Sequence, residues 1–181
     1  MVDLERWRSY LLLLARAQLG LGPRQLDASD VVQETLLAAH KQAAQFRGNT
    51  EEERAAWLRR LLHGQMVDAW RRIHTRKRDV QRERSLEAAL EASSARMQAF
   101  LADTGPSPSG LAAKHEDIAR LAEALIQVPE AQRQAVELRH VLGLPLEEIS
   151  RQLERSPAAV AGLLKRGLHR LREILQESEE S

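Results

Sequence analysis

The chain has 181 residues with a formal net charge of +1, 43% hydrophobic residues, 3% aromatic residues and no cysteine. This composition supports a folded helical core, disfavours a β-sandwich or barrel, and excludes disulfides and thiolate zinc sites. No apolar run approaches the roughly 20 residues of a membrane span, and the start of the chain lacks the features of a signal peptide, so we expect a cytoplasmic protein without membrane insertion.

The first half of the sequence predicts three helices. The first has apolar residues every three or four positions, at Leu4, Trp7, Leu11 and Leu14. The glycines and the proline within 20–23 end it, and a second helix is expected over roughly 30–46, with Ser29 or Asp30 as its cap. The run Thr50–Glu53 has the form of a capping box, in which a hydroxyl and a carboxylate each satisfy a free backbone amide. A long third helix should therefore begin there.

The second half predicts a linker and a compact helical domain. Residues 85–101 have helical spacing, and the run at 104–110 is rich in Gly, Pro and Ser, which favour extended or flexible backbone. Four short helices are expected after it. We therefore predict an all-α fold of two small helical domains joined by a flexible linker, with boundaries at 1–84, 85–113 (the linker), 114–176 and 177–181 (an acidic tail).

The last two predicted helices form a helix-turn-helix pattern. A short helix at 145–153 is followed by the tight turn Glu154–Ser156 and a longer helix at 157–172, for which Ser156 is a cap and Pro157 the first residue. In such a motif the first helix braces the second, which enters the major groove of DNA. Basic residues of the second helix can then meet phosphates.

Basic residues gather in two places, although the chain is almost neutral. One cluster comprises Arg71, Arg72, Arg76, Lys77, Arg78, Arg82 and Arg84, and the other comprises Lys165, Arg166, Arg170 and Arg172. Two separate basic patches are typical of a protein that contacts a polyanion, and a solvated helix face is the other interpretation.

Stretches in both halves resemble the extracytoplasmic-function (ECF) sigma factors of bacterial RNA polymerase. The second half is similar to the family's fourth conserved region at 137–150, 156–160 and 168–172. In the first half, Asp27–Thr35 is similar to the polymerase-binding helix, and Ala56–Arg60 with Asp68–Arg72 is similar to the promoter-melting segment. The resemblance covers nearly all of the chain, with the two regions in the family's order.

The resemblance implies a sigma factor with the second and fourth regions only. Such a protein binds the clamp helices and the flap of core RNA polymerase, captures the downstream promoter element as a single strand, and reads the upstream element as duplex. It has no catalytic chemistry of its own and needs no cofactor. Many relatives are held inactive by an anti-sigma factor, but no residue here identifies such a partner.

The resemblance also implies three sets of site residues. The polymerase-binding set is Asp30, Val31, Gln33 and Glu34. The set for the downstream element and melting is Phe46, Arg47, Asn49, Thr50, Trp70, Arg71, Arg72, Arg76 and Lys77. The set for the upstream element is Arg155, Ser156, Ala158, Ala159, Gly162, Lys165, Arg166, His169 and Arg170.

The chemistry of these residues agrees with two of the implied roles. Opening duplex DNA costs about 1.4 kcal/mol of stacking per base step, and a pocket that holds an extruded base offsets that cost. Asn49 can bond a base edge and Gly48 allows close approach, although the same loop can be a plain turn with Asn49 or Thr50 as a cap. The arginines that follow suit phosphates, whereas the apolar spacing of Trp57 and Trp70 favours core packing.

The predicted recognition helix departs from the family in its first turns. Ala158, Ala159, Ala161 and Gly162 lie there, and alanine cannot make the paired hydrogen bonds that discriminate strongly between bases. Phosphate anchoring or DNA shape should then carry more of the recognition.

Two alternatives stay open on the residues alone. A conventional helix-turn-helix regulator explains 114–176 and leaves the first half unexplained, and a helical interaction protein without DNA reading fits the alanine-rich helix. The six histidines lack metal-ligand spacing, and no Gly-rich phosphate loop or nucleophile motif occurs, so we do not expect an enzyme.

Overall fold

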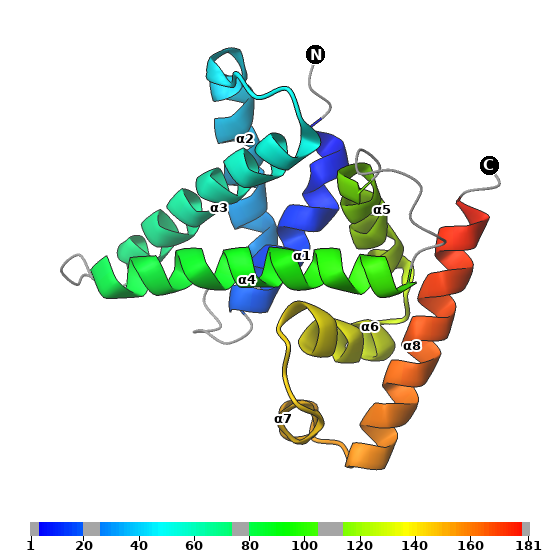
Figure 1. Ribbon diagram of the computed structural model, residues 1–181. Coiled ribbons are helices and arrows are strands. Elements are labelled where there is room, and N and C mark those ends of the chain that lie inside the picture. Colours follow the sequence, from blue (N-terminus) through cyan, green and yellow to red (C-terminus); the bar gives the residue numbers. More distant parts are fainter. Residues whose placement is uncertain (1–3, 20–25, 74–79, 105–113, 179–181) are drawn as a thin grey trace. The chain divides into compact units, whose positions relative to one another are not determined.

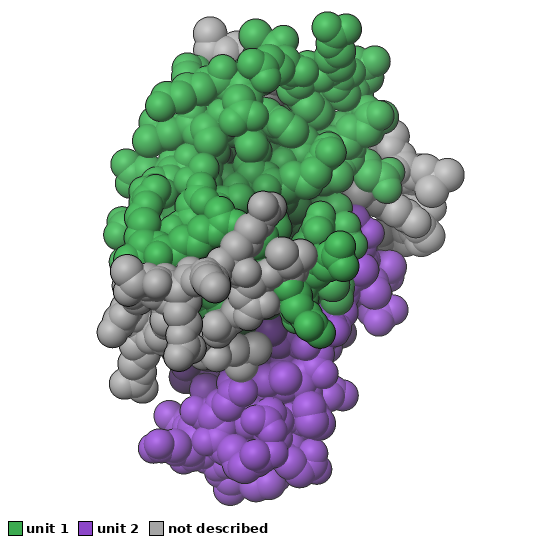
Figure 2. All heavy atoms as spheres, turned by 90° about the vertical axis from the view of Figure 1, so that its left-hand side faces the viewer, with its two compact units in different colours: residues 1–92 green, residues 93–181 purple. Residues whose placement is uncertain are grey.

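The computed structural model describes residues 4–19, 26–73, 80–104 and 114–178 (Figure 1). Within these ranges the chain is helical and contains no β-strand, which confirms the predicted all-α class. It divides into two compact units, Met1–Ala92 and Ser93–Ser181 (Figure 2). The Gly-, Pro- and Ser-rich run at 104–110, within the linker predicted at 85–113, lies outside the described residues apart from Thr104.

The first unit is built on three helices that pack on one another. A 3-10 turn, η1 (Glu5–Trp7), leads into α1 (Arg8–Leu19), and α2 (Ala28–Gln42), a short η2 (Ala43–Gln45) and α3 (Glu51–Ile73) follow. Their shared core contains the fully buried side chains of Trp7, Tyr10, Leu11, Leu14, Leu58, Leu62 and Met66. Of the periodic apolar residues predicted for the first helix, Trp7, Leu11 and Leu14 therefore lie in the core and Leu4 is only partly buried. On the third helix, Trp57 and Trp70, for which core packing was favoured, are half-buried.

The start of α2 differs from the expectation. Its N-cap is Asp27, whose carboxylate accepts a hydrogen bond from the Ser29 backbone amide at 2.7 Å. The predicted caps, Ser29 and Asp30, lie inside the first turn instead. Asp27, Ser29 and Asp30 are all of the cap-forming type, and the one that comes first in the chain is the cap.

Helix α4 (Val80–Thr104) is longer than the predicted 85–101. Its residues from Ser93 onward belong to the second unit, where Met97 is fully buried and Phe100 is 5% exposed. The Phe100 ring stacks on the His140 imidazole, with 4.2 Å between the ring centroids. The second half of α4 is thus part of the core of the C-terminal unit.

Among the described residues, the remainder of the second unit comprises the four expected helices and one irregular turn. The elements are α5 (Lys114–Gln127), α6 (Glu130–Val136), a π-helical turn η3 (Glu137–Val141), α7 (Leu146–Gln152) and α8 (Pro157–Glu177). Gly143 ends the π-helical turn with φ at +74°, as expected of a glycine stop. Helical spacing predicts Val160, Leu164, Leu168 and Leu171 on the inner face of α8. Val160 and Leu171 are buried, but Leu164 and Leu168 are only half-buried, and Leu163 and Gly167 are buried in their place.

Candidate nucleic-acid interface

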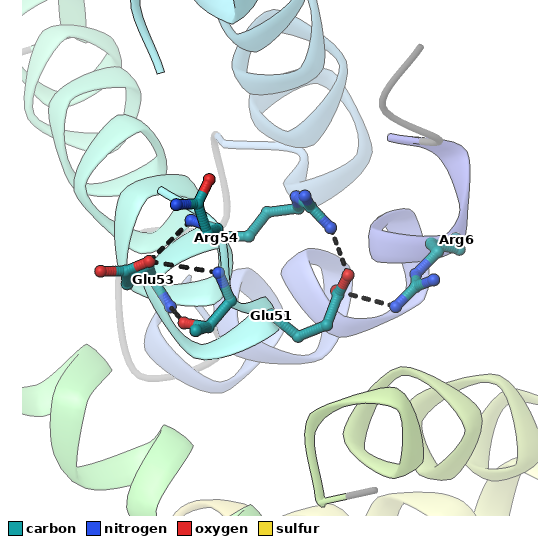
Figure 3. A network of polar contacts seen from close by, with 6 residues as sticks. Arg6, Glu51, Glu53 and Arg54 are labelled. Carbon is teal, nitrogen blue, oxygen red and sulfur yellow. Dashed lines mark hydrogen bonds and ion pairs between the residues drawn. The ribbon is translucent and has the colours of Figure 1, made fainter. Parts of the chain in front are cut away.

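The Phe46–Thr50 loop has a fixed backbone because the predicted capping box forms. The Glu53 backbone amide donates to the Thr50 hydroxyl at 3.1 Å, and the Glu53 carboxylate accepts from the Thr50 amide at 3.1 Å and from the Asn49 amide at 2.8 Å (Figure 3). These backbone donors, first that of Asn49 and then that of Thr50, hold the pKa of Glu53 below its ordinary value. The box confirms the helix start and orders the loop that precedes it.

The aromatic residue of this loop is used for packing. The Phe46 ring stacks on Trp57 of α3, with centroids 4.7 Å apart and planes at 24°, and the Arg54 guanidinium lies over Phe46 at 5.9 Å from its centroid. A Cβ on Gly48 would come within 2.4 Å of the Phe46 ring. Glycine is therefore required at 48 by this packing, and Phe46 does not project freely from the loop.

The polar residues of the loop face solvent. Arg47, Asn49 and Thr50 are exposed, while Phe46 is half-buried. Since Glu53 takes the backbone amides of Asn49 and Thr50, the Asn49 side chain is left at the surface of an ordered turn. An exposed amide on a fixed backbone is suited to hydrogen-bonding a base edge.

The basic residues that follow lie at the other end of α3. Arg71 pairs with Glu83 at 2.5 Å and with Asp68 at 3.6 Å, and Arg72 pairs with Glu34 at 3.1 Å. Trp70 is half-buried, and the predicted contacts Arg76 and Lys77 lie outside the described residues. Exposed ion pairs of this kind are weak, so a phosphate can take either guanidinium from its carboxylate.

The length of α3 separates the two parts of the downstream set. A helix of the 23 residues from Glu51 to Ile73 spans about 34 Å at 1.5 Å per residue. Asn49 therefore cannot contact the same nucleotide as Arg71 or Arg72.

The predicted polymerase-binding set lies on α2 and divides by burial. Asp30 and Gln33 are exposed and Glu34 is partly exposed, but Val31 is only 3% exposed. Val31 therefore packs in the core, and its side chain is not available to a partner. Leu37, one turn beyond Gln33 and Glu34, is 55% exposed and is the large hydrophobic residue with the greatest exposure among those described.

Leu37 was missed by reasoning from the sequence. The sequence predicted a helix over roughly 30–46, without any assignment of which face Leu37 occupies. The spacing Asp30, Gln33, Glu34, Leu37 gives the signal that was available, since positions i, i+3, i+4 and i+7 share one helix face.

The helix-turn-helix forms as the sequence predicts. Between α7 and α8, Glu154 adopts φ of +51°, and the Ser156 hydroxyl accepts from the Ala159 backbone amide at 3.2 Å. Pro157 is the first helical residue of α8. Arg155, Ser156, Ala158 and Ala159 are all exposed, so the first turn of α8 and the turn before it form an open surface.

Further along α8, the basic residues are exposed but not equivalent. Lys165 and Arg166 are exposed. Arg170 pairs with Glu173 at 3.0 Å and with Glu177 at 3.6 Å, and the hydrogen bond to Glu173 is the main reason that the pKa of Arg170 is raised. His169 also lies within 3.3 Å of Glu173. Lys165 and Arg166 are therefore the stronger candidates for phosphate contacts.

Gly162 and Gly167 on α8 differ in what they allow. A Cβ on Gly162 would approach only the flexible end of Arg166, at 3.2 Å. A Cβ on Gly167 would come within 2.9 Å of Val136 and 3.2 Å of the Gln132 carbonyl oxygen of α6. Gly167 therefore permits the close packing of α8 on α6, a role that the sequence analysis did not assign.

The described part of the chain offers neither a metal site nor a membrane-spanning helix. Within it, no group of three or more His, Cys, Asp or Glu side chains is arranged to hold a metal ion. None of the helices there is long and apolar enough to cross a membrane.

Comparisons with known proteins connect both units to one family. Residues 7–77 match the model for Sigma-70 region 2, and residues 118–171 match the model for Sigma-70, region 4. The chain is 29% identical over 153 residues to the ECF RNA polymerase sigma factor SigF of Caulobacter vibrioides, across 84% of this chain and 73% of that protein. It is 26% identical over 167 residues to the RNA polymerase sigma factor CnrH of Cupriavidus metallidurans, across 92% of this chain and 83% of that protein.

A helix-turn-helix unit and a second helical unit, each matching a region of the same family, define a transcription initiation factor. The chain belongs to the sigma-70 family, as an ECF sigma factor that directs transcription initiation. As a member of this family it binds core RNA polymerase and promoter DNA. A conventional helix-turn-helix regulator would leave the region 2 match unexplained.

Proposed function

We propose that the first unit performs two tasks on separate surfaces. The exposed face of α2, with Asp30, Gln33, Glu34 and Leu37, binds the clamp helices of core polymerase. The Phe46–Thr50 loop, at the start of α3, captures one extruded base of the downstream promoter element. Arg71 and Arg72, with Arg76 and Lys77 beyond them, hold phosphates at the far end of α3.

The arrangement of acidic and apolar side chains supports the α2 assignment. An exposed leucine rimmed by carboxylates and an amide is a feature of binding surfaces rather than of an ordinary solvated helix. Glu34 is shared with Arg72 through their ion pair. Polymerase binding at α2 can therefore release Arg72 for a DNA phosphate.

The exposed Asn49 side chain on a capped loop is the observation that carries the base-capture proposal. The capping box uses the backbone donors of Asn49 and Thr50 and leaves the side-chain amide outward. Because the turn is already ordered, a base that binds there loses little free energy to ordering the protein. The captured base offsets part of the cost of unstacking the duplex.

The C-terminal unit reads the upstream element as duplex, with α8 in the major groove, and contacts the polymerase flap. Its open first turn offers Ala158 and Ala159, whose methyl groups can touch a thymine methyl but cannot form paired hydrogen bonds. The turn residues Arg155 and Ser156 and the exposed Lys165 and Arg166 supply phosphate contacts. We therefore expect affinity to depend strongly on salt and only moderately on upstream sequence.

Asn49→Ala tests the base-capture proposal. Loss of a base contact worth about 1 kcal/mol should slow open-complex formation about fivefold, measured by permanganate reactivity of unpaired thymines. Core binding should be unchanged, and premelted promoter DNA should restore much of the loss because opening has already occurred.

Gln45→Ala is the matched control, because Gln45 is exposed just before the loop. It should open promoters normally. If Asn49→Ala also opens duplex promoters at the normal rate, the base pocket lies elsewhere in the first unit. Deletion of Gly48 and Asn49 is a less clean test, because it also removes a donor to Glu53 and the glycine that packs on Phe46.

A further inference from the structure

A series of charged and aromatic contacts connects the N-terminal turn η1 to the Phe46–Thr50 loop. The Glu51 carboxylate bridges two guanidinium groups, accepting from Arg6 Nη2 at 2.7 Å through one oxygen and from Arg54 through the other (Figure 3). Arg6 belongs to η1, 45 residues earlier in the chain. The network therefore joins segments that are far apart in the sequence.

Arg54 carries this connection to the loop. Its guanidinium lies over the Phe46 ring, and Phe46 stacks in turn on Trp57. The Phe46 ring also occupies the space that any side chain at Gly48 would need. The position of Arg54 therefore helps to set where Phe46 lies, and Phe46 sets the course of the backbone that leads to Asn49.

The charges make Glu51 the critical member of the network. Two arginines share one carboxylate, and their side chains are only 30% (Arg6) and 20% (Arg54) exposed, against 27% for Glu51. The Nε atoms of both arginines are buried and have no hydrogen-bond partner among the described residues. Without the carboxylate charge, two partly buried cations would face each other, and Arg54 would gain by turning toward solvent.

We propose that Glu51, held by Arg6, is a positioning residue for base capture. It fixes Arg54 over Phe46 and so keeps the Asn49 loop in its binding geometry before DNA arrives. This inference rests on the proposed role of the loop. A loop fixed in advance loses less conformational entropy when the base binds, and it rejects bases that do not fit its geometry. Glu51 acts through Arg54 and does not touch DNA.

Glu51→Gln keeps the size and shape of the side chain and removes the charge. The full-length variant, assembled with core polymerase, is expected to form open complexes about fivefold more slowly on duplex promoters. It should also discriminate less between bases at the captured position, which a purely structural role would not change. Premelted DNA should restore opening, and core binding should equal that of the wild type.

Four variants sharpen the test. Glu52→Gln, in the same helical turn, is the matched control and should behave as the wild type. Arg6→Lys keeps the charge and should retain most of the activity, whereas Arg6→Gln should lose it in part. In the Arg6→Gln/Glu51→Gln double variant one of the two unbalanced cations is gone, so its defect should be smaller than the sum of the two single defects.

The outcomes separate this inference from the proposed function. If Asn49→Ala slows opening and Glu51→Gln does not, the loop holds the base but the network does not position it, and the inference is overturned. If Glu51→Gln lowers core binding or remains defective on premelted DNA with unchanged base discrimination, its role is structural and the inference is again overturned. If Asn49→Ala opens promoters normally, the proposed function of the loop fails and the inference fails with it.

Discussion

Two helical glycines, Gly64 and Gly167, lie in opposite surroundings. A Cβ on Gly64 of α3 would meet no heavy atom within 4 Å, apart from its own helix and chain neighbours. A Cβ on Gly167 of α8 would lie 2.9 Å from Val136 and 3.2 Å from a backbone oxygen of α6. Glycine therefore lowers the stability of α3 without allowing any closer contact, whereas on α8 it allows close packing against α6.

This contrast gives a paired prediction for stability. Gly64→Ala should raise the free energy of unfolding of the first unit by about 0.5–1 kcal/mol, because alanine loses less backbone entropy in a helix. Gly167→Ala should lower that of the second unit by about 1–3 kcal/mol, because the added methyl overpacks the α6–α8 contact. Thermal or urea unfolding of the full-length variants measures both, and equal shifts of the same sign would contradict the packing argument.

Residues whose partners are close in sequence were the ones that could be predicted. The Thr50–Glu53 box and the Ser156 cap each need only one helical turn, and both form as expected. The Arg6–Glu51 pair spans 45 residues, and no local rule connects two such positions. The burial of Val31 was missed for a related reason, since the resemblance identifies a segment and not which of its side chains face the core.

At the scale of elements, the periodic helices were predictable and the irregular turn was not. Helical spacing located α1, α3 and α8 well, and the position of the helix-turn-helix followed from a cap and a proline. The π-helical turn at Glu137–Val141 contains no glycine or proline, so the spacing of apolar residues alone predicts that α6 continues through it. Residues of the turn contact α4, which lies far from them in the sequence.

One of those contacts is the stack of His140, in the π-helical turn, on Phe100 of α4. Burial is the main cause of the lowered pKa of His140, and neighbouring Arg139 adds to it while Asp103 of α4 opposes it. The protonated imidazole is thus disfavoured in the folded unit. Between the lowered pKa and the ordinary value of about 6.5, the unfolded chain binds more protons than the folded one.

The second unit should therefore lose free energy of unfolding as the pH falls from 7 through that window. The unfolded chain takes up the proton on His140 more readily than the folded unit does, so falling pH favours unfolding until both states are protonated. His140→Phe keeps a ring to stack on Phe100 but cannot titrate, so it should reduce the loss of unfolding free energy between pH 7 and pH 5.5. Urea unfolding at both pH values measures this effect. Between pH 7.5 and 8.5 the two proteins should show the same pH slope, and an equal loss in the acid range would exclude His140 as its source.

At the scale of the whole molecule, the loop and the arginines proposed to bind DNA in the first unit are well separated along α3. The base-capture loop precedes α3, Arg71 and Arg72 lie about 34 Å away at its other end, and the α2 face is joined to that end by the pair of Glu34 with Arg72. About 34 Å corresponds to one turn of duplex DNA. The arginines are therefore placed for phosphates well removed from the captured base.

Binding to core polymerase should depend on the exposed face of α2. Leu37 is 55% exposed, so Leu37→Ala should leave thermal unfolding unchanged. If the side chain is buried at the clamp, its loss removes about 1.5–3 kcal/mol of apolar burial and should weaken core binding at least tenfold.

Asp30→Arg should weaken core binding as well, by placing a cation against a basic clamp. Glu52→Arg makes the same charge change at the start of α3 and should leave core binding unchanged. Titration of labelled core polymerase with each variant measures the affinities. Full-strength binding by both folded α2 variants would move the polymerase interface off this face of α2.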